Sequence, residues 1–329
     1  MKQFLQKKAK LVFLCMLVLL TCTACANPRG RDGKTLADQI IASEETTIDA
    51  SKINYKDISD KKLKKEIKKN IKDGQYTIQP TTFKNSMSKG WFEGLIVWPI
   101  AQIINLISSK TDAGVGIILT TLLIQMLVFV FTRKSQMSTQ RMQEIQPEIQ
   151  KIQNKYKDKT DERSKMQMAQ EMQNIYQKYD IHPFGSMLIT FIQLPIMMGM
   201  YYATMRSVSV VSGSFMGISL AGTPLDGFKA FDIAYISIYV LMVIFYIVSM
   251  KLPQWLKKWQ DKKDNVKVKK YAQEETNPMA NSMNMSMYFM TAMICIMYIS
   301  WPMAMSFYWL VSSVIRVCQS LILHKVMNK

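Results

Sequence analysis

The sequence is poor in the residues that most catalytic and metal sites need. It has only two histidines, His182 and His324, which lie far apart along the chain. Its five cysteines lie at positions 15, 22, 25, 295 and 318, three near the N-terminus and two within late apolar runs. This distribution supports neither a disulfide scaffold nor a zinc module. The apolar runs also lack paired acids and a Ser/His set, so we expect no cofactor, no metal and no chemical catalysis.

Acidic residues are scarce beside basic ones. The chain has 24 acidic and 42 basic residues and a formal charge of +18, yet 49% of its 329 residues are apolar. A soluble chain with this charge would be polar throughout, whereas charged and apolar residues here occupy separate blocks. Such segregation is typical of membrane proteins. We predict an all-α polytopic membrane protein with five transmembrane helices.

The N-terminus has the pattern of an export signal. Four lysines precede a ten-residue apolar run, Leu11 to Leu20, which is too short for a comfortable span. The stretch TCTACA that follows resembles a bacterial lipoprotein cleavage box. We therefore predict a lipoprotein signal peptide over residues 1–24 and lipidation, by palmitate-type chains, at Cys25. Cys22 is an alternative site, and an ordinary signal or an uncleaved anchor are alternative readings.

Residues 25–90 are polar and lysine-rich, and we predict an extracytoplasmic polar spacer there. Within residues 57–73, Leu63, Ile67 and Ile71 recur every fourth residue, which indicates a charged helix with a thin apolar stripe. Its positive face would suit anionic lipid headgroups. A solvated spacer explains the same pattern more simply.

Five later segments are long and apolar enough to cross a bilayer. They cover residues 113–132, 184–205, 231–250, 285–300 and 302–323. Residues 91–108 are nearly as apolar, but if they crossed too, the basic loops would lie outside the cell, against the positive-inside rule. Trp91 and Trp98 suit the headgroup level. We therefore predict an interfacial amphipathic helix over 91–108.

The charges of the connecting segments set the direction of each span. With a lipid-anchored N-terminus outside the cell, the first span runs inward. Residues 133–181, the loop 251–282 and the tail 324–329 then lie in the cytoplasm, and these are the basic segments. The sequence thus predicts a multi-pass protein of a bacterial plasma membrane.

Residues 133–181 have the periodicity of a coiled-coil hairpin. Apolar residues recur at alternating spacings of three and four from Met142 to Tyr156, and again from Met168 to Tyr179, on either side of the turn-like stretch 157–164. Contact with a ribosome or a targeting factor fits this surface, and a purely structural hairpin fits it equally well.

Polar residues within the predicted spans are the main functional signal. Arg316 is the one clear charge, and insertion of a charge into hydrocarbon costs roughly 2.5–3.5 kcal/mol. At 100° per residue it shares a face of its helix with Tyr308, Ser312 and Gln319. Weaker polar stripes occur on the first span (Thr121, Gln125 and Thr132) and on the second (Gln193, Met197, Tyr201 and Thr204). Together they predict a hydrated groove, although each residue alone is explained by helix–helix adhesion.

The depth of two of these residues is consistent with a shared groove. Gln125 and Arg316 both lie a few residues beyond the midpoint of an inward-running span, about 4–5 Å toward the cytoplasm. We predict that they face each other.

Four stretches resemble the YidC/Oxa family of membrane protein insertases, in its Gram-positive lipoprotein form. They are QPEIQKIQNKY (146–156), HPFGSMLITFIQLPIMMGMYYATMR (182–206), NPMANSMNMSMYFMTAM (277–293) and WPMAMSFYWLVSSVIRVCQ (301–319). The resemblance implies five core spans, a cytoplasmic helical hairpin and a hydrophilic groove open to the cytoplasm and to lipid but closed outside.

The resemblance also assigns roles to residues. Tyr308 and Trp309 match an aromatic pair of the last span and are candidates for client contact, together with Gln193, Met197 and Tyr201. Members usually carry an arginine in the first span, where this chain has Gln125. We hypothesise that Arg316 supplies the missing charge from the opposite wall; a specialised paralogue without a strong groove charge is the alternative.

The predicted function is insertion and folding of membrane proteins without chemical catalysis. The expected partners are nascent membrane protein clients and the lipid bilayer, with the ribosome and the Sec translocon contacting the hairpin 133–181 and the C-terminal tail. A small-solute transporter is a competing hypothesis, which inverted repeats would favour, and no such internal symmetry is visible. An intramembrane enzyme is a third, and the spans lack its chemistry.

Overall fold

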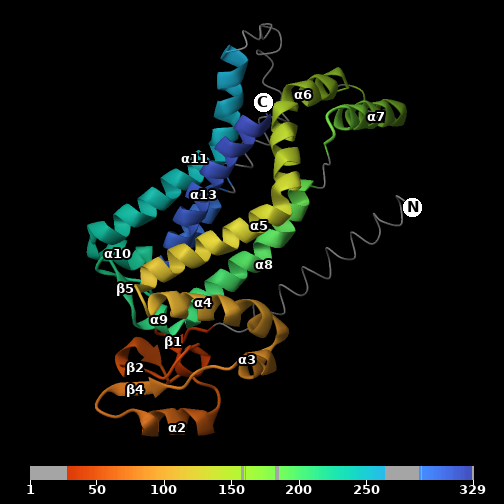
Figure 1. The fold of residues 1–329 in the computed structure, drawn as a ribbon. Coiled ribbons are helices and arrows are strands. Elements are labelled where there is room, and N and C mark those ends of the chain that lie inside the picture. Colours follow the sequence, from red (N-terminus) through yellow and green to blue (C-terminus); the bar gives the residue numbers. More distant parts are fainter. Residues whose placement is uncertain are drawn as a thin grey trace. The chain divides into compact units, whose positions relative to one another are not determined.

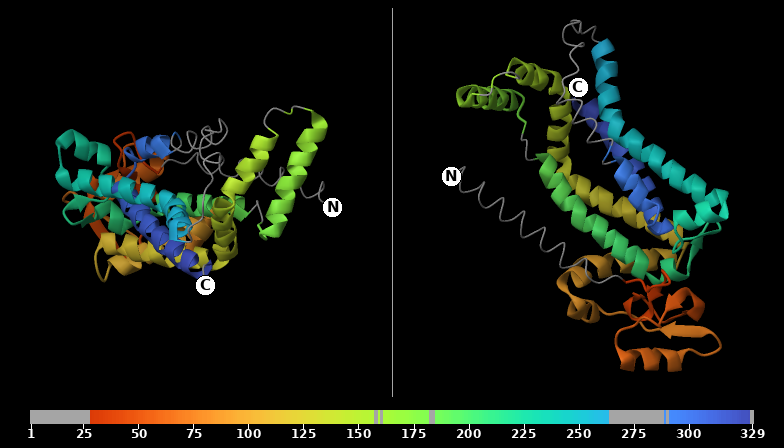
Figure 2. Two further views of the ribbon diagram at one scale, coloured as in Figure 1. Left: turned by 90° about the horizontal axis from the view of Figure 1, so that it is seen from above. Right: turned by 180° about the vertical axis from the view of Figure 1, so that it is seen from behind.

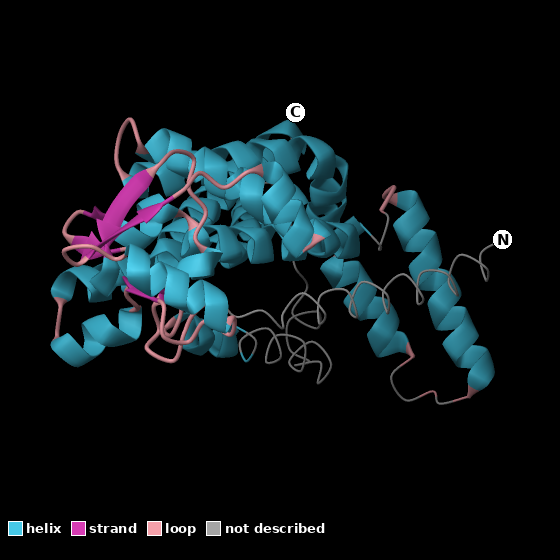
Figure 3. Ribbon diagram, turned by 90° about the horizontal axis from the view of Figure 1, so that it is seen from below, coloured by secondary structure: helices cyan, strands magenta, loops and turns pink. Residues whose placement is uncertain are grey.

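The computed structural model describes residues 28–156, 159, 161–181, 185–263, 289 and 291–327. The predicted signal peptide, Cys25, residues 264–282 of the predicted loop, and residues 285–288 and 290 of the predicted fourth span lie outside this range. The described chain is mostly helical, with a few short strands (Figure 3). It divides into two compact units. Unit 1 comprises the chain up to Thr120, Leu194–Gly222 and Pro302–Met305, and unit 2 comprises Thr121–Gln193, Thr223–Trp301 and Ser306–Lys329.

Short strands and helices form the N-terminal part of unit 1 (Figure 1). β1 (Thr35–Leu36) pairs in parallel with β3 (Ile53–Asn54), and β2 (Thr46–Asp49) pairs antiparallel with β4 (Gln75–Ile78). The connections contain the short helices η1 (Ala37–Gln39) and η2 (Ala50–Lys52) and the helix α2 (Lys61–Asn70). α2 begins after Asp60, whose carboxylate accepts hydrogen bonds from two backbone N–H groups of the first turn.

The rest of unit 1 is helical apart from one hairpin. Its elements are α3 (Phe83–Lys89), the π-helix η3 (Glu93–Val97), α4 (Trp98–Ser108), α9 (Val208–Ser212), and the strands β5 (Ser214–Phe215) and β6 (Ile218–Ser219). Three long helices begin or end in it and continue into unit 2: α5 (Ala113–Glu144), α8 (Gly185–Arg206) and α13 (Met303–Met327).

The predicted spacer is a folded structure with its own core. Apolar residues scattered between positions 37 and 78 pack together with two valines of α9; they are Ala37, Ile40, Ala42, Ile48, Ile53, Ile58, Ile67, Ile78, Val208 and Val211. Ile67 is 3% exposed and Leu63 packs beside it, so the predicted stripe of α2 faces this core. The lysines of α2 cover only the outer surface, and residues 28–90 are therefore ordered rather than a solvated spacer.

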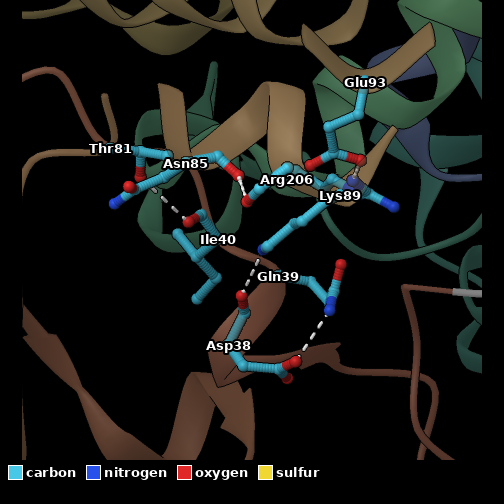
Figure 4. Close-up of polar contacts among 9 residues, drawn as sticks. Asp38, Gln39, Ile40, Thr81, Asn85, Lys89, Glu93 and Arg206 are labelled. Carbon is cyan, nitrogen blue, oxygen red and sulfur yellow. Dashed lines mark hydrogen bonds and ion pairs between the residues drawn. The ribbon is translucent and has the colours of Figure 1, made fainter. Parts of the chain in front are cut away.

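Buried polar contacts fasten this N-terminal part to the helices of unit 1. Asn105 of α4 is 1% exposed; its amide donates to the Ile41 carbonyl at 2.8 Å and its oxygen accepts from Ser207 Oγ at 2.5 Å. Glu93 of η3 pairs with Arg206 at the end of α8, and Lys89 donates to the Asp38 carbonyl at 2.8 Å (Figure 4). Burial, and then the positive charge of Arg206, lower the pKa of Lys89.

Unit 2 is built from long apolar helices and a helical hairpin. Besides its parts of α5, α8 and α13 it contains α6 (Gln146–Lys155), α7 (Glu162–Lys178), α10 (Pro224–Ala230) and α11 (Ile233–Lys263). Three helices of the described chain are long and apolar enough to cross a membrane, over Ala113–Met142, Ile233–Gln260 and Met303–Val326. α11 continues as one helix 13 residues past the predicted end of its span, into the predicted cytoplasmic loop.

The hairpin α6–α7 buries the predicted stripe. Figure 2 and Figure 3 show its two helices side by side. Ile145, Ile149 and Ile181 form its core, with Met142, Met172, Ile175, Tyr176 and Tyr179 packed against it. Polar contacts link the two sides of the hairpin: Tyr179 donates to the Glu148 carboxylate at 2.6 Å, and Glu171 pairs with Lys155 at 2.5 Å and accepts from the Tyr156 hydroxyl at 3.0 Å. Three residues of the predicted stripe, Met142, Ile145 and Ile149, thus lie in the core of the hairpin.

Candidate functional site

The polar stripe of α5 faces the protein interior. Thr121 and Thr132 are 0% exposed and Gln125 is 6% exposed. The exposed side of the same helix is apolar and carries Leu122, Leu123, Met126, Leu127, Val130 and Phe131. α13 likewise has a buried polar side and an exposed apolar side, since Tyr308 and Ser312 are buried while Leu321 and Ile322 are exposed. This orientation is what a lipid environment favours, because polar groups facing hydrocarbon are costly.

Side chains from three helices of unit 2 join in a polar cluster, which we define as Gln125, Gln193, Tyr308 and Ser312. Gln125 Nε2 of α5 donates to Ser312 Oγ of α13 at 3.1 Å. Gln193 Nε2 of α8 donates to the Tyr308 hydroxyl at 3.2 Å. Tyr308 and Ser312 are one turn apart on α13, so both glutamines reach the same face of that helix.

Arg316 lies one turn beyond Ser312 on α13. Its Nη2 donates to Ser313 Oγ at 3.1 Å, and its guanidinium lies 5.6 Å from the ring centre of Trp309 and 5.8 Å from that of Tyr246. Both distances are within the range of a cation–π contact. Within the described part of the chain, no carboxylate forms an ion pair with Arg316.

Two buried N–H groups at this site find no acceptor among the described residues. They are Arg316 Nε and Trp309 Nε1. A buried donor without a partner costs about 1–3 kcal/mol, and more when the group is charged. The site is therefore suited to a polar guest, such as water or a peptide, that supplies acceptors.

An aromatic wall borders Arg316. The Tyr298 ring stacks on Trp309 with centres 4.9 Å apart, and Tyr246 of α11 meets Trp309 edge-on at 6.2 Å. Sequence reasoning did not single out Tyr246, because an aromatic residue inside an apolar span gives no signal of its own.

The structure brings some of the predicted site residues together and leaves others apart. Gln125 contacts Ser312 and Arg316 contacts Ser313, and the facing of Gln125 and Arg316 stays a prediction. Gln319 is partly buried further along α13. Met197 and Tyr201 belong to unit 1, where the Tyr201 ring contacts Tyr202 at 5.5 Å.

Two cavities of the described chain lie away from the polar cluster. One of about 410 Å³ lies in the hairpin, lined by Arg141, Ile145, Glu148, Lys178, Tyr179 and Asp180. Another of about 390 Å³ lies in the N-terminal part of unit 1, between η2, β3 and the adjoining loops. Neither is lined by a residue of the polar cluster.

The family model described as "60Kd inner membrane protein" matches residues 105–329, which include the polar cluster, Arg316 and the hairpin. The chain belongs to the YidC/Oxa family of membrane protein insertases. Its YidC/Oxa relatives include "Membrane protein insertase YidC 1" of Streptococcus pyogenes, 30% identical over 237 residues that cover 72% of this chain and 75% of the relative. "Membrane protein insertase MisCA" of Bacillus subtilis is 27% identical over 238 residues, covering 72% and 80%.

A third YidC/Oxa relative, "Membrane protein insertase YidC" of Enterococcus faecalis, is 30% identical over 237 residues, covering 72% of this chain and 76% of its own. Membership of this family and the apolar helices identify the chain as a bacterial membrane protein of the insertase type. The family match leaves residues 28–104, and with them α2 and the strands β1 to β4, outside its range.

Proposed function

We propose that the chain inserts membrane proteins and helps them fold through a polar, positively charged groove formed by α5, α8 and α13. The proposed groove opens to the cytoplasm and to lipid and is closed outside, and no bond is made or broken. The observation that carries this proposal is Arg316, a partly buried cation without a carboxylate partner in the described chain, next to a buried Trp309 N–H without an acceptor.

The mechanism follows from the chemistry of the client. A client's polar segment loses its water when it enters hydrocarbon, and each unsatisfied backbone group then costs several kcal/mol. Arg316 and the polar cluster offer hydrogen-bond partners partway across, which lowers this barrier. The apolar helix of the client then moves into lipid and gains the free energy of hydrophobic transfer.

Client contact is assigned to residues around the groove. Trp309 and Tyr308 offer aromatic surfaces beside the cation, and Gln193 offers an amide. Met197 and Tyr201 lie further along α8 and are also assigned to client contact. A methionine side chain can adapt to client helices of varied shape. Thr121 and Gln319 extend the polar lining.

The proposed arrangement in the membrane has five spans. The N-terminus, lipidated at Cys25, lies outside the cell, and α4 lies in the outer interface. The hairpin and the C-terminal tail lie in the cytoplasm, where the ribosome and the Sec translocon would contact them. Exposed Trp91, Leu95 and Leu106 around α4 suit an interfacial position.

Substitution of Arg316 tests the role of the charge. Reconstituted into liposomes, Arg316→Ala should lose most insertion of a client, measured by protease protection, while Arg316→Lys keeps part of it. Arg133→Ala removes an exposed cation of α5 and serves as the matched control. Restoring charge in Gln125→Arg/Arg316→Ala should recover insertion. Full activity of Arg316→Ala would exclude the charge from the mechanism.

Crosslinking distinguishes an insertase from a transporter. A photoreactive residue in place of Gln193 or Trp309 should trap ribosome-bound nascent membrane proteins and not nascent secreted ones of the same length. A failure to trap any nascent chain, with normal insertion by the same variant, would show that clients do not pass this site.

A further inference from the structure

The outer face of α2 is a dense array of lysines. Six of its ten residues are lysine, Lys61, Lys62, Lys64, Lys65, Lys68 and Lys69, and Glu66 is its one acid. At 100° per residue the lysines fill an arc of about 160° centred opposite Leu63 and Ile67. All but Lys64 are exposed, and the exposed Lys56 and Lys72 flank the helix.

This array is electrostatically unfavourable by itself. Lysines three and four residues apart, such as Lys61, Lys65 and Lys68, repel one another across the helix surface. Among the residues that the structure describes, none of the α2 lysines forms an ion pair. A bound anion with several charges would remove the repulsion, and a helix of ten residues offers it a row about 15 Å long.

The apolar side of α2 is not available for a membrane. A helix that lies in a bilayer interface inserts its apolar face between the lipids. The apolar face of α2 is instead occupied, because Ile67 and Leu63 pack on the core of unit 1. The partner of α2 must therefore be held by charge alone.

The position of α2 within unit 1 points it away from the proposed interface. α2 contacts β4, β4 pairs with β2, β2 contacts α9, and α9 packs against α4. Figure 1 and the right view of Figure 2 both place α2 and α4 at opposite ends of this series. With α4 at the outer membrane interface, as in the proposed function, the lysine face is directed into the extracytoplasmic space.

From these observations we propose that the α2 face binds an extended polyanion of phosphate or phosphodiester units on the outer side of the membrane. A linear chain of phosphates matches a linear array of lysines, and binding requires no apolar contact. The inference rests on the outward orientation in the proposed function and not on the groove.

The test measures binding by the full-length protein in nanodiscs of phosphatidylcholine, with fluorescent inorganic polyphosphate as the probe and anisotropy as the signal. The variant replaces Lys61, Lys62, Lys65 and Lys68 by glutamine. The control removes the same charge elsewhere, by glutamine at the exposed Lys134, Lys151, Lys165 and Lys262. Because these side chains are exposed, both variants should keep the wild-type melting temperature.

The α2 variant should bind polyphosphate at least about tenfold more weakly than the control variant does. Its plot of log K against log salt should become shallower by about 3, since each contact with a single-stranded polyanion contributes about 0.7. Arginine at the same four positions should restore binding. Equal binding by the α2 variant and the control variant would overturn the proposal.

A second arm separates the two sources of phosphate. Vesicles of phosphatidylglycerol and phosphatidylcholine replace polyphosphate, and co-sedimentation with the nanodiscs is measured. If the α2 lysines contributed more to the affinity for vesicles than to the affinity for polyphosphate, the partner would be a lipid surface and the proposal would be overturned. Insertion of a client should be normal in the α2 variant, so failure of this proposal is distinguishable from failure of the groove.

Discussion

Removal of one partner of the buried ion pair between Glu93 and Arg206 should strongly destabilise unit 1. The Arg206 side chain is 4% exposed and that of Glu93 is 11% exposed. Glu93→Leu leaves the guanidinium buried without its counter-charge, and removal of one partner from a buried pair costs about 3–5 kcal/mol. Arg206 keeps a cation–π contact with Tyr202 at 5.3 Å, so we expect the lower end, about 3 kcal/mol.

The assay is thermal unfolding in detergent, and the unfolding of unit 1 is monitored by its susceptibility to proteolysis. For a cooperative unit of about 150 residues, 3 kcal/mol lowers Tm by about 6–12 °C. The double variant Glu93→Leu/Arg206→Met replaces the pair by apolar side chains and should recover most of this loss. Glu44→Leu, at an exposed position, is the control. A single variant within 1 °C of wild type, or a double variant no better than the single one, would refute this reasoning.

Three further predictions concern other parts of the chain. Ile67→Ala empties part of the unit 1 core and should destabilise it by about 2–5 kcal/mol, measured as faster amide exchange in β4, whereas Lys65→Ala on the same helix should not. In the hairpin, hydrogen bonds from Ser164 lower the pKa of Asp161 below its usual 3.8; its stabilising effect is therefore complete above that pH and is lost as the pH falls through the lowered value. The first-turn amides of α7 should then lose protection in acid, measured as the exchange rate relative to the intrinsic rate at the same pH, and Asp161→Asn should abolish this dependence; unchanged protection would contradict it. Gln125→Leu removes the hydrogen bond to Ser312, worth about 0.6 kcal/mol between helices in a bilayer, and should lower Tm by only about 1–2 °C; a loss of 5 °C or more would show a larger role.

The sequence predicted elements whose periodicity is long and regular. In the hairpin, a spacing of three and four residues favours one contact face, and Met142, Ile145 and Ile149 of the predicted stripe lie in the core of α6–α7. Gln125 and Ser312 are buried, as the predicted polar stripes require, and their place in a groove stays a prediction. The count of five spans stays a prediction, and three candidate spans are found in the described chain.

The N-terminal fold could not be predicted in the same way. Ile40, Ile48, Ile53 and Ile78 lie in short strands and turns, where the spacing of core residues follows no helical period. The apolar stripe of α2 was visible in the sequence, but the lysines around it favoured a solvated helix, so the packing of Leu63 and Ile67 on a core was missed. The partnership of Glu93 with Arg206 was also missed, although a single acid within the apolar stretch 91–108 was a usable signal.

The extent of α11 was underestimated for a physical reason. Its charged C-terminal part, with Pro253, has the composition of a loop, yet the helix continues to Lys263. Pro253 follows several apolar helical turns, which keep the helix formed despite the proline. Trp255 and Trp259, both exposed, extend the apolar surface of α11 beyond it.

The most direct test of the central claim is the water accessibility of Ser312. Ser312→Cys is placed in a chain in which Cys295 and Cys318 are alanine, and a membrane-impermeant maleimide is added to either side of sealed vesicles. The lipid-side position Val314→Cys is the control. A groove that is wet and open to the cytoplasm predicts labelling of Ser312→Cys from the cytoplasmic side alone. Labelling no faster than that of Val314→Cys would mean a dry interior and would contradict the proposed mechanism.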